Sequence, residues 1–164
     1  MIVAGIDPGL GGAIAVMNEC RHCETSDMPT MGEGTQRMIN AHEVARFLTE
    51  RDVEFAVVEE VSAMPKQGVS STFRFGGAYY GILCTLQVLG IPYQVVRPAA
   101  WKKAMGVPAD KEVCRRKAIE LLPKAAQQFA RKKDDGRAEA ALLCLWKLGL
   151  GPAEREDVEG PLKP

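Results

Sequence analysis

The chain has 164 residues, of which 46% are hydrophobic, and it carries 21 basic and 21 acidic side chains. That length favours one domain with a single core, and the apolar fraction is ordinary for a globular protein. No apolar run approaches the roughly 18 residues that cross a bilayer, and the N-terminal segment lacks signal-peptide features. We therefore expect a cytoplasmic protein with no membrane partner.

The first part of the chain is dominated by strand patterns. They cover residues 2–7, 13–17, 21–28 and 54–60. The first three follow one another through short turns, which predicts an antiparallel meander. Residues 29–34 break the pattern, and apolar positions within 41–51 repeat at a helical spacing.

The second part is mostly helical. A loop over 62–71 precedes a largely apolar helix predicted for 72–89, and a strand pattern covers 92–96. Further helical patterns cover about 98–105, about 109–130 with an interruption at Pro123, and 135–148. A meander followed by alternating helices and strands predicts an α/β fold, with a mixed five-stranded sheet flanked by helices on both faces. We expect 1–150 to form this domain and 151–164 to be a poorly ordered tail.

Carboxylates occur where apolar segments end or begin. They are Asp7, Glu59, Glu60, Asp134, Asp135 and Glu139. Each has an ordinary explanation alone, because aspartate commonly caps helices or forms turns. Asp135 and Glu139, four residues apart, share one face of the final helix. Together the three places offer the oxygen ligands that Mg²⁺ prefers, and a pair of such ions about 4 Å apart can catalyse phosphodiester hydrolysis.

Basic residues are concentrated late in the chain. The segment 97–133 has eleven Lys or Arg and three Asp or Glu. This asymmetry indicates either a basic face for a polyanion or a solvated helical surface. The candidates for sequence-independent phosphate contacts are Lys66, Arg97, Lys102, Lys103, Arg115 and Arg116.

Five cysteines lie at positions 20, 23, 84, 114 and 144. An odd number of scattered thiols fits a reducing compartment. Only Cys20 and Cys23 form a close pair, and the second pair that a four-ligand zinc site usually needs does not occur. We therefore expect surface thiols here and no zinc site.

Three motifs together resemble the RuvC-type Holliday junction resolvases of the RNase H-like superfamily. They are Gly-Ile-Asp-Pro-Gly at 5–9, Val-Val-Glu-Glu-Val at 57–61, and Asp-Gly-Arg-Ala-Glu-Ala-Ala-Leu-Leu at 135–143. Residues 63–71 look most like the bacteriophage and prophage branch, and the match spans about 1–149. The resemblance implies an RNase H-like fold and a homodimer that cuts four-way or branched DNA with two Mg²⁺ or Mn²⁺ ions and no nucleotide cofactor.

The resemblance also assigns site residues. Asp7, Glu59 and Glu139 carry over as metal ligands. Strand alternation alone does not separate Glu59 from its neighbour, and the family pattern points to Glu59. Glu139 stands where the family usually has aspartate, and the preceding family ligand lies three residues earlier, at Gly136. We take Asp135 as the fourth ligand on helical geometry.

Further residues match features of the family near the DNA. Lys111, at a helix start, matches a lysine near the reaction centre, where it could steady the scissile phosphate. Phe73, Arg74 and Phe75 lie where a family aromatic stacks on junction bases. The two rings cannot share one helix face, so we expect one to be exposed and one buried, with core or dimer contacts as the alternative. The resemblance makes the helix of 72–89 the dimer seam.

Other functions fit part of this pattern. Actin-like ATPases and sugar kinases share an Asp-x-Gly turn, but they need a second similar domain, for which we expect no room. An RNase H-like ribonuclease or exonuclease would keep the fold and act on another substrate. A module that binds branched DNA without cutting it would suit an altered acidic set, such as one with glutamate at 139.

Overall fold

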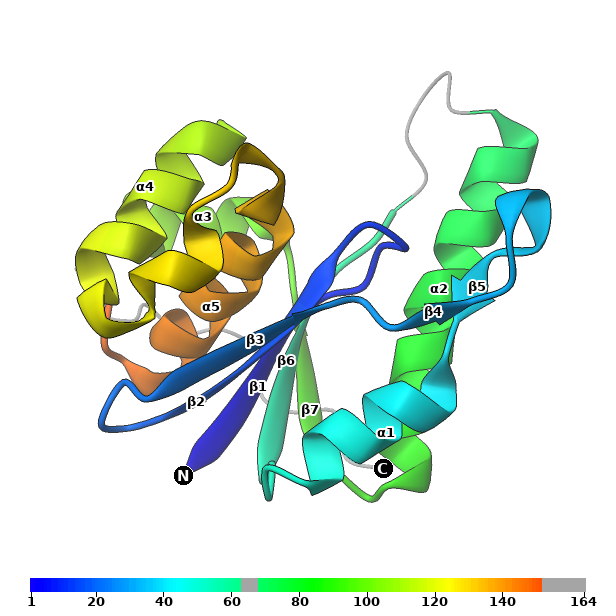
Figure 1. Cartoon of the computed structure of the whole chain (residues 1–164), viewed down its shortest axis with the longest axis horizontal. Helices are drawn as coiled ribbons and strands as arrows, with labels where there is room; N and C mark the ends of the chain where they lie inside the picture. Colours follow the sequence, from blue (N-terminus) through cyan, green and yellow to red (C-terminus); the bar gives the residue numbers. More distant parts are fainter. Residues whose placement is uncertain (63–67, 152–164) are drawn as a thin grey trace.

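The computed structural model describes residues 1–62 and 68–151, and its centre is a mixed five-stranded sheet (Figure 1). The strands are β1 (Ile2–Asp7), β2 (Ala13–Asn18), β3 (Cys23–Asp27), β6 (Phe55–Glu59) and β7 (Tyr93–Val96). Their order is β3-β2-β1-β6-β7. The β1–β2 and β2–β3 pairs are antiparallel, whereas β1–β6 and β6–β7 are parallel. The mixed five-stranded sheet predicted from the sequence is confirmed.

Helices cover both faces of the sheet, as Figure 1 shows. The helices are α1 (Ala41–Thr49), α2 (Val69–Val88), α3 (Pro98–Met105), α4 (Lys111–Leu121) and α5 (Asp135–Leu148). The first two pack on one face and the other three on the opposite face. Within the described residues, none of these helices has the length and apolar character needed to cross a membrane.

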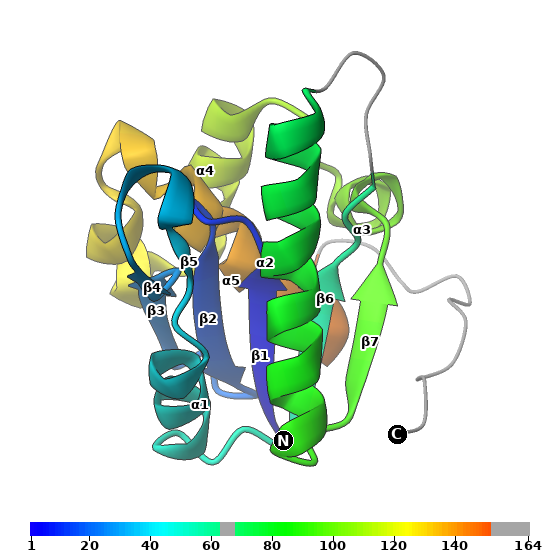
Figure 2. The same cartoon turned by 90° about the vertical axis from the view of Figure 1, so that its right-hand side faces the viewer.

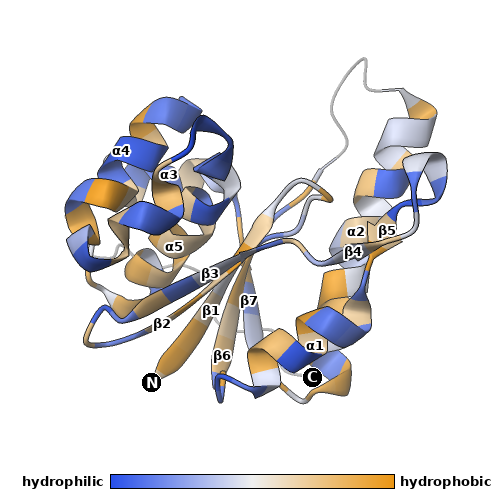
Figure 3. Ribbon diagram, in the orientation of Figure 1, coloured by the Kyte–Doolittle hydropathy of each residue, from blue (hydrophilic) through white to orange (hydrophobic). Residues whose placement is uncertain are grey.

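Two apolar cores explain why β1, β2 and β6 are apolar at nearly every position. Side chains of a strand alternate between faces, so Val3 joins the core under α5 while Ala4 joins the core under α1 and α2. Figure 3 shows the apolar strands between the two helical layers. A strand buried on both faces needs a continuous apolar run, which is the pattern that the sequence shows.

Helix α5 lies unusually close to β1. A Cβ atom at Gly5 would lie 2.0 Å from the carbonyl oxygen of Ala140, so only glycine permits this approach. The central residues of α5, from Ala138 to Trp146, are all buried. This contact fixes the first turns of α5 beside the end of β1.

The largest departure from the predicted elements lies in residues 29–39. These residues form a small hairpin of β4 (Thr30–Met31) and β5 (Met38–Ile39), with the 3-10 turn η1 (Gly34–Gln36) between them. Figure 2 shows this hairpin beside α2, which crosses the sheet. Two-residue strands give no periodic signal, so the sequence showed only an interruption here.

The remaining differences concern helix boundaries. Helix α2 begins at Val69, three residues before the predicted start. The segment predicted as one interrupted helix ends at Leu121 and continues as the 3-10 helix η2 (Pro123–Phe129), because proline removes a backbone donor. A second 3-10 turn, η3 (Lys132–Asp134), leads into α5. The expected tail at 151–164 lies outside the described residues except for Gly151.

Candidate active site

Three carboxylates meet where β1 and β6 end. These strands are parallel neighbours, with Ile6 opposite Val58, so Asp7 and Glu59 follow at the same edge. Val3 and Val57 both face α5, and alternation places Asp7 and Glu59 on that face too. Glu139 approaches from the second turn of α5, and its charge acts on both carboxyl groups.

The pKa values of the two strand-end carboxyl groups are raised. Burial raises the pKa of Asp7 to about 6, and the neighbouring charge of Glu139 adds to the rise, whereas a hydrogen bond from the Gly9 amide opposes it. Burial also raises the pKa of Glu59 to about 7, against the hydrogen bond from Trp101. Both shifts mean that this environment disfavours unneutralised negative charge.

Two lysines balance the acidic groups that α5 contributes. Lys102 Nζ lies 2.5 Å from Glu139 Oε1, and their side chains are only 15% and 8% exposed. Lys111 Nζ lies 2.5 Å from Asp135 Oδ2, at the solvent-exposed margin of the site. We had expected Lys102 to contact phosphate from the protein surface, but its amino group instead faces the carboxylates.

Trp101 completes the surroundings of Glu59. Its side chain is fully buried, and its Nε1 donates a hydrogen bond of 2.7 Å to Glu59 Oε2. No motif in the sequence marked Trp101 as a site residue. The available signal was its position just after β7, because β7 runs parallel to β6 and the following helix therefore starts at the same sheet edge.

The structure distinguishes the adjacent acidic residues that the sequence could not separate. Glu60 pairs with Arg97 at 3.2 Å, and its charge acts on Tyr79 of α2, on the opposite face of the sheet from Glu59. Asp134 is buried but binds Arg131 through both of its carboxylate oxygens. Although burial opposes it, this contact lowers the pKa of Asp134.

Gly136 occupies the position where the family usually has an acidic ligand. A Cβ atom there would lie 3.4 Å from Asp7 Oδ2. A side chain at position 136 would thus point toward Asp7, but this chain has none. The nearest carboxylate in sequence is Asp135, and its charge raises the pKa of Asp7 slightly.

The donor set fits a hard divalent cation in its chemistry. It consists of carboxylate oxygens, which Mg²⁺ and Mn²⁺ prefer, and burial raises the pKa values of Asp7 and Glu59 despite the nearby charges of Lys111 and Lys102. Among residues 1–62 and 68–151, no group of three acidic, histidine or cysteine side chains is arranged to hold a metal ion. In this arrangement the carboxylates of Glu139 and Asp135 are paired with Lys102 and Lys111 instead.

The other residues that were predicted to contact DNA differ in their exposure and in their partners. Phe73 is 81% exposed, whereas Phe75 is partly buried against the turn at Gly9. Arg115 is committed to Glu112 and to backbone carbonyls, including that of Phe129, which indicates a structural role. The side chains of Arg74, Arg97, Lys103 and Arg116 are exposed. Lys66 lies outside the described residues.

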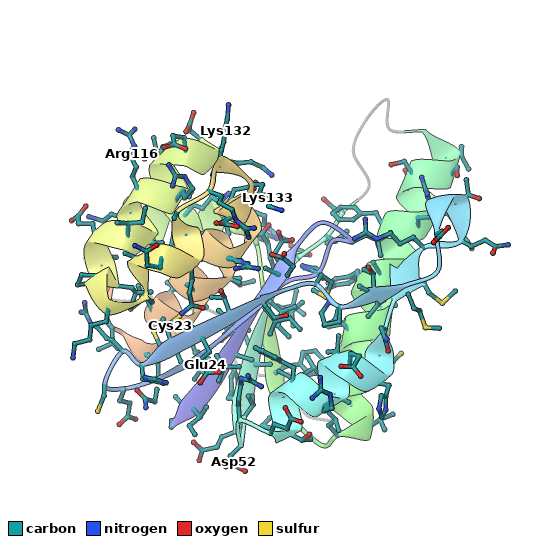
Figure 4. All side chains as sticks on the ribbon, in the orientation of Figure 1. Cys23, Glu24, Asp52, Arg116, Lys132 and Lys133 are labelled. Atoms are coloured by element: carbon teal, nitrogen blue, oxygen red, sulfur yellow. The ribbon has the colours of Figure 1, made fainter. Side chains whose placement is uncertain are left out.

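Exposed basic residues also gather at one end of the molecule. Figure 4 shows Arg116, Lys132 and Lys133 at the end toward which β1 runs, while Glu24 and Asp52 lie at the other end. Positive charge at the end where β1 and β6 finish favours the approach of a polyanion to that end.

Solved structures share this architecture. A structure of T. thermophilus RuvC in complex with a Holliday junction substrate matches with a TM-score of 0.66 and 21% identity, over 99% of each chain. This chain has the RuvC fold. A second structure of Thermus thermophilus RuvC matches with a TM-score of 0.64 and 21% identity, over 99% of this chain and 100% of that one.

The match to RuvC is evident in structure rather than in sequence. The yeast mitochondrial Holliday junction resolvase matches less well, with a TM-score of 0.49 and 16% identity over 89% of this chain and 77% of that one. No protein-family model and no curated protein matches the sequence. The predicted RNase H-like fold is confirmed, and the resemblance to RuvC was carried by the short motifs at the ends of β1 and β6 and by the one in α5.

Proposed function

We propose that this protein is a metal-dependent endonuclease that cuts four-way or branched DNA. The observation that carries the proposal is the meeting of Asp7, Glu59 and Glu139 at one sheet edge of a RuvC fold. Buried like charges are costly unless a proton or a cation neutralises them. A site that keeps three such groups together is therefore suited to dications.

The residues that would hold the ions are Asp7, Glu59, Asp135 and Glu139. When bound, two Mg²⁺ or Mn²⁺ ions would supply an activated water and stabilise the leaving oxygen. Before binding, Lys102 and Lys111 neutralise Glu139 and Asp135. Once those contacts open, the two ammonium groups lie where they can stabilise negative charge on a scissile phosphate.

Branched DNA is the substrate that we infer, because of the surface around the site. One of the RuvC structures with the same fold is a complex with a Holliday junction substrate. In this chain, the exposed ring of Phe73 lies at the start of α2, where it is available to stack on an unpaired base. The exposed side chains of Arg116, Lys132 and Lys133, at the end toward which β1 runs, can bind the phosphates.

A homodimer is also part of the proposal. Helix α2 also exposes Val69, Tyr80 and Val88, whose spacing places them along one side of the helix. An apolar stripe of this length marks an interaction surface. A two-fold dimer built on α2 would present two identical sites to the two equivalent strands of a four-way junction.

The deciding experiment is a substrate panel. Labelled four-way DNA, linear duplex and an RNA–DNA hybrid are incubated with and without Mg²⁺. We expect Mg²⁺-dependent cleavage of the four-way DNA, abolished in Asp7→Asn without loss of binding and slowed in Lys111→Ala. Full activity of Asp7→Asn would overturn the metal-ligand assignment, and preferred cleavage of the hybrid would indicate a ribonuclease.

One observation favours a second function, a module that binds branched DNA without cutting it. Gly136 has no side chain, so the position next to Asp7 where the resemblance places a carboxylate has none. In addition, Asp135 and Glu139 of α5 are both paired with lysines. Tight binding of four-way DNA without products, in Mg²⁺ and in Mn²⁺, would favour this module. Cleavage that is gained by Gly136→Asp would identify the missing ligand as the cause.

A further inference from the structure

A cavity of about 340 Å³ lies between the β4–β5 hairpin and the first turns of α2, which lie side by side in Figure 2. The described residues that line it are Leu10, Gly34, Arg37, Ser71, Arg74 and Phe75. Two of these side chains are cationic and one is aromatic, and none of the six is acidic. We call this cavity the Arg37 pocket.

The hairpin holds Arg37 in a fixed position. Its Nε donates a hydrogen bond of 3.1 Å to Thr30 Oγ1, and its Nη2 donates one of 3.1 Å to the carbonyl oxygen of Leu10. A guanidinium group has five N–H donors, so most of them are not used by these two bonds. Leu10 belongs to the turn that follows Asp7, so Arg37 places a positive charge against the turn between β1 and β2.

Helix α2 supplies a second cation and an aromatic ring. Arg74 is exposed, and its contact of 3.5 Å with the Gly34 carbonyl is at the limit of a hydrogen bond. The ring of Phe75 lies 3.5 Å from the place where a Cβ atom at Gly9 would be. The ring is thus packed against the same turn that Arg37 contacts. Paired guanidinium groups suit a phosphate, and a neighbouring ring suits a nucleobase.

We propose that the Arg37 pocket binds one unpaired nucleotide of a branched DNA strand, with its phosphate at Arg37 and Arg74 and its base against Phe75. The inference rests on the proposed function, because it takes the ligand to be DNA. It adds the hairpin to the DNA-binding surface, which the sequence did not indicate. Since the pocket adjoins the turn after Asp7, a nucleotide held there would keep the DNA strand at the same end of β1 as the carboxylates.

The test measures binding in EDTA, so that cleavage plays no part. Anisotropy of a labelled four-way DNA with unpaired nucleotides at its centre is recorded between about 50 and 200 mM salt. For Arg37→Ala we expect about tenfold weaker binding. We also expect the plot of log binding constant against log salt concentration (the salt slope) to be shallower by about 0.9, the value for one lost phosphate contact. Arg37→Lys should keep the slope. Arg46→Ala on α1, which removes an exposed arginine bonded only to its own helix, is the matched control.

The outcomes separate this inference from the proposed function. An unchanged slope in Arg37→Ala, or a loss of affinity no greater than in Arg46→Ala, would overturn the pocket. If Arg37→Ala does not fold, Arg37→Lys becomes the test. A salt slope that is reduced in Arg37→Lys would then overturn the proposed pocket. Phe75→Leu should weaken binding of the centre-unpaired junction more than that of a fully paired duplex, and equal losses would exclude the stacked base. If the wild-type protein binds no branched DNA, the proposed function fails and this inference fails with it.

Discussion

At the scale of single residues, the sequence located acidic groups better than it located the groups around them. Asp7 and Glu59 end apolar strands, a position that is visible in the sequence, and both lie at the site. Trp101 and Lys102 reach the same place only because α3 packs beside β6 after a parallel crossover. The face of a short helix that is buried depends on how the helix packs against other elements. The sequence of eight residues alone therefore does not predict which side chains point into the site.

The hydrogen bond between Trp101 and Glu59 leads to a prediction about metal binding. Trp101→Phe keeps an aromatic ring in the core but removes the donor that orients Glu59. Mutation of a residue that orients a metal ligand typically lowers metal affinity by about 10–100-fold. We expect the Mn²⁺ affinity, measured by isothermal titration calorimetry, to fall by that factor. The Mn²⁺ concentration for half-maximal cleavage should rise by the same factor. Trp146→Phe, in the buried part of α5, is the control, and equal Mn²⁺ affinities in the two variants would refute the role of Trp101.

The raised pKa values of Asp7 and Glu59 predict how stability depends on pH without metal. Their pKa values rise from 3.8 and 4.5 to about 6 and about 7 in the folded state. Between about pH 4 and pH 7 the folded protein therefore holds protons that the unfolded chain has released. The contribution of these groups is most favourable below their ordinary pKa values and is lost as pH rises through the raised ones.

Urea unfolding in EDTA measures this dependence. We expect the free energy of unfolding of the wild type to fall over that interval relative to the double variant Asp7→Asn, Glu59→Gln, which cannot titrate at these positions. Added Mg²⁺ should remove most of the difference, because a bound cation replaces the protons. Parallel pH curves for the two proteins in EDTA would contradict the prediction.

At the scale of elements, the sequence predicted best the elements that have a periodic apolar pattern and clear end signals. Helices α3 and α5 have the predicted bounds, because each carries a distinct apolar period between clear end signals. The β4–β5 hairpin did not emerge from the sequence, since its strands have two residues each and it is held by side-chain contacts such as that of Arg37 with Leu10. The sheet order followed from the order of strands and helices along the chain.

The close approach of α5 to β1 predicts a strong steric effect. In Gly5→Ala, the new Cβ atom would lie 2.0 Å from the Ala140 carbonyl, so the helix must move away from the strand. Overpacking of this kind costs about 1–3 kcal/mol or more, and the shift carries Glu139 away from Asp7. We expect a lower melting temperature and lost cleavage. Gly11→Ala, where no atom lies within 4 Å of the new group, should change stability by less than about 0.5 kcal/mol, and a similar loss there would exclude the steric explanation.

At the scale of the whole molecule, one chain presents a single set of carboxylates, whereas a four-way junction has two equivalent strands to cut. In the proposed dimer, the exposed apolar residues along α2 would form the surface on which two chains join. Tyr80, at 65% exposure, lies near the middle of this stripe. A charge placed there would remain hydrated in a monomer but would be buried and unpaired in a dimer, which is strongly unfavourable.

Tyr80→Glu should therefore yield a folded monomer, whereas the same change at exposed His42 on α1 should leave the dimer intact. Light scattering after size exclusion gives the mass, and a supercoiled plasmid with a cruciform reports how the two cuts are coordinated. A dimer that cuts both strands within one complex produces linear plasmid, and a monomer produces mainly nicked circles. If Tyr80→Glu stays dimeric, the interface does not lie on this face of α2. If it is monomeric and still linearises the plasmid, the two cuts do not require paired sites.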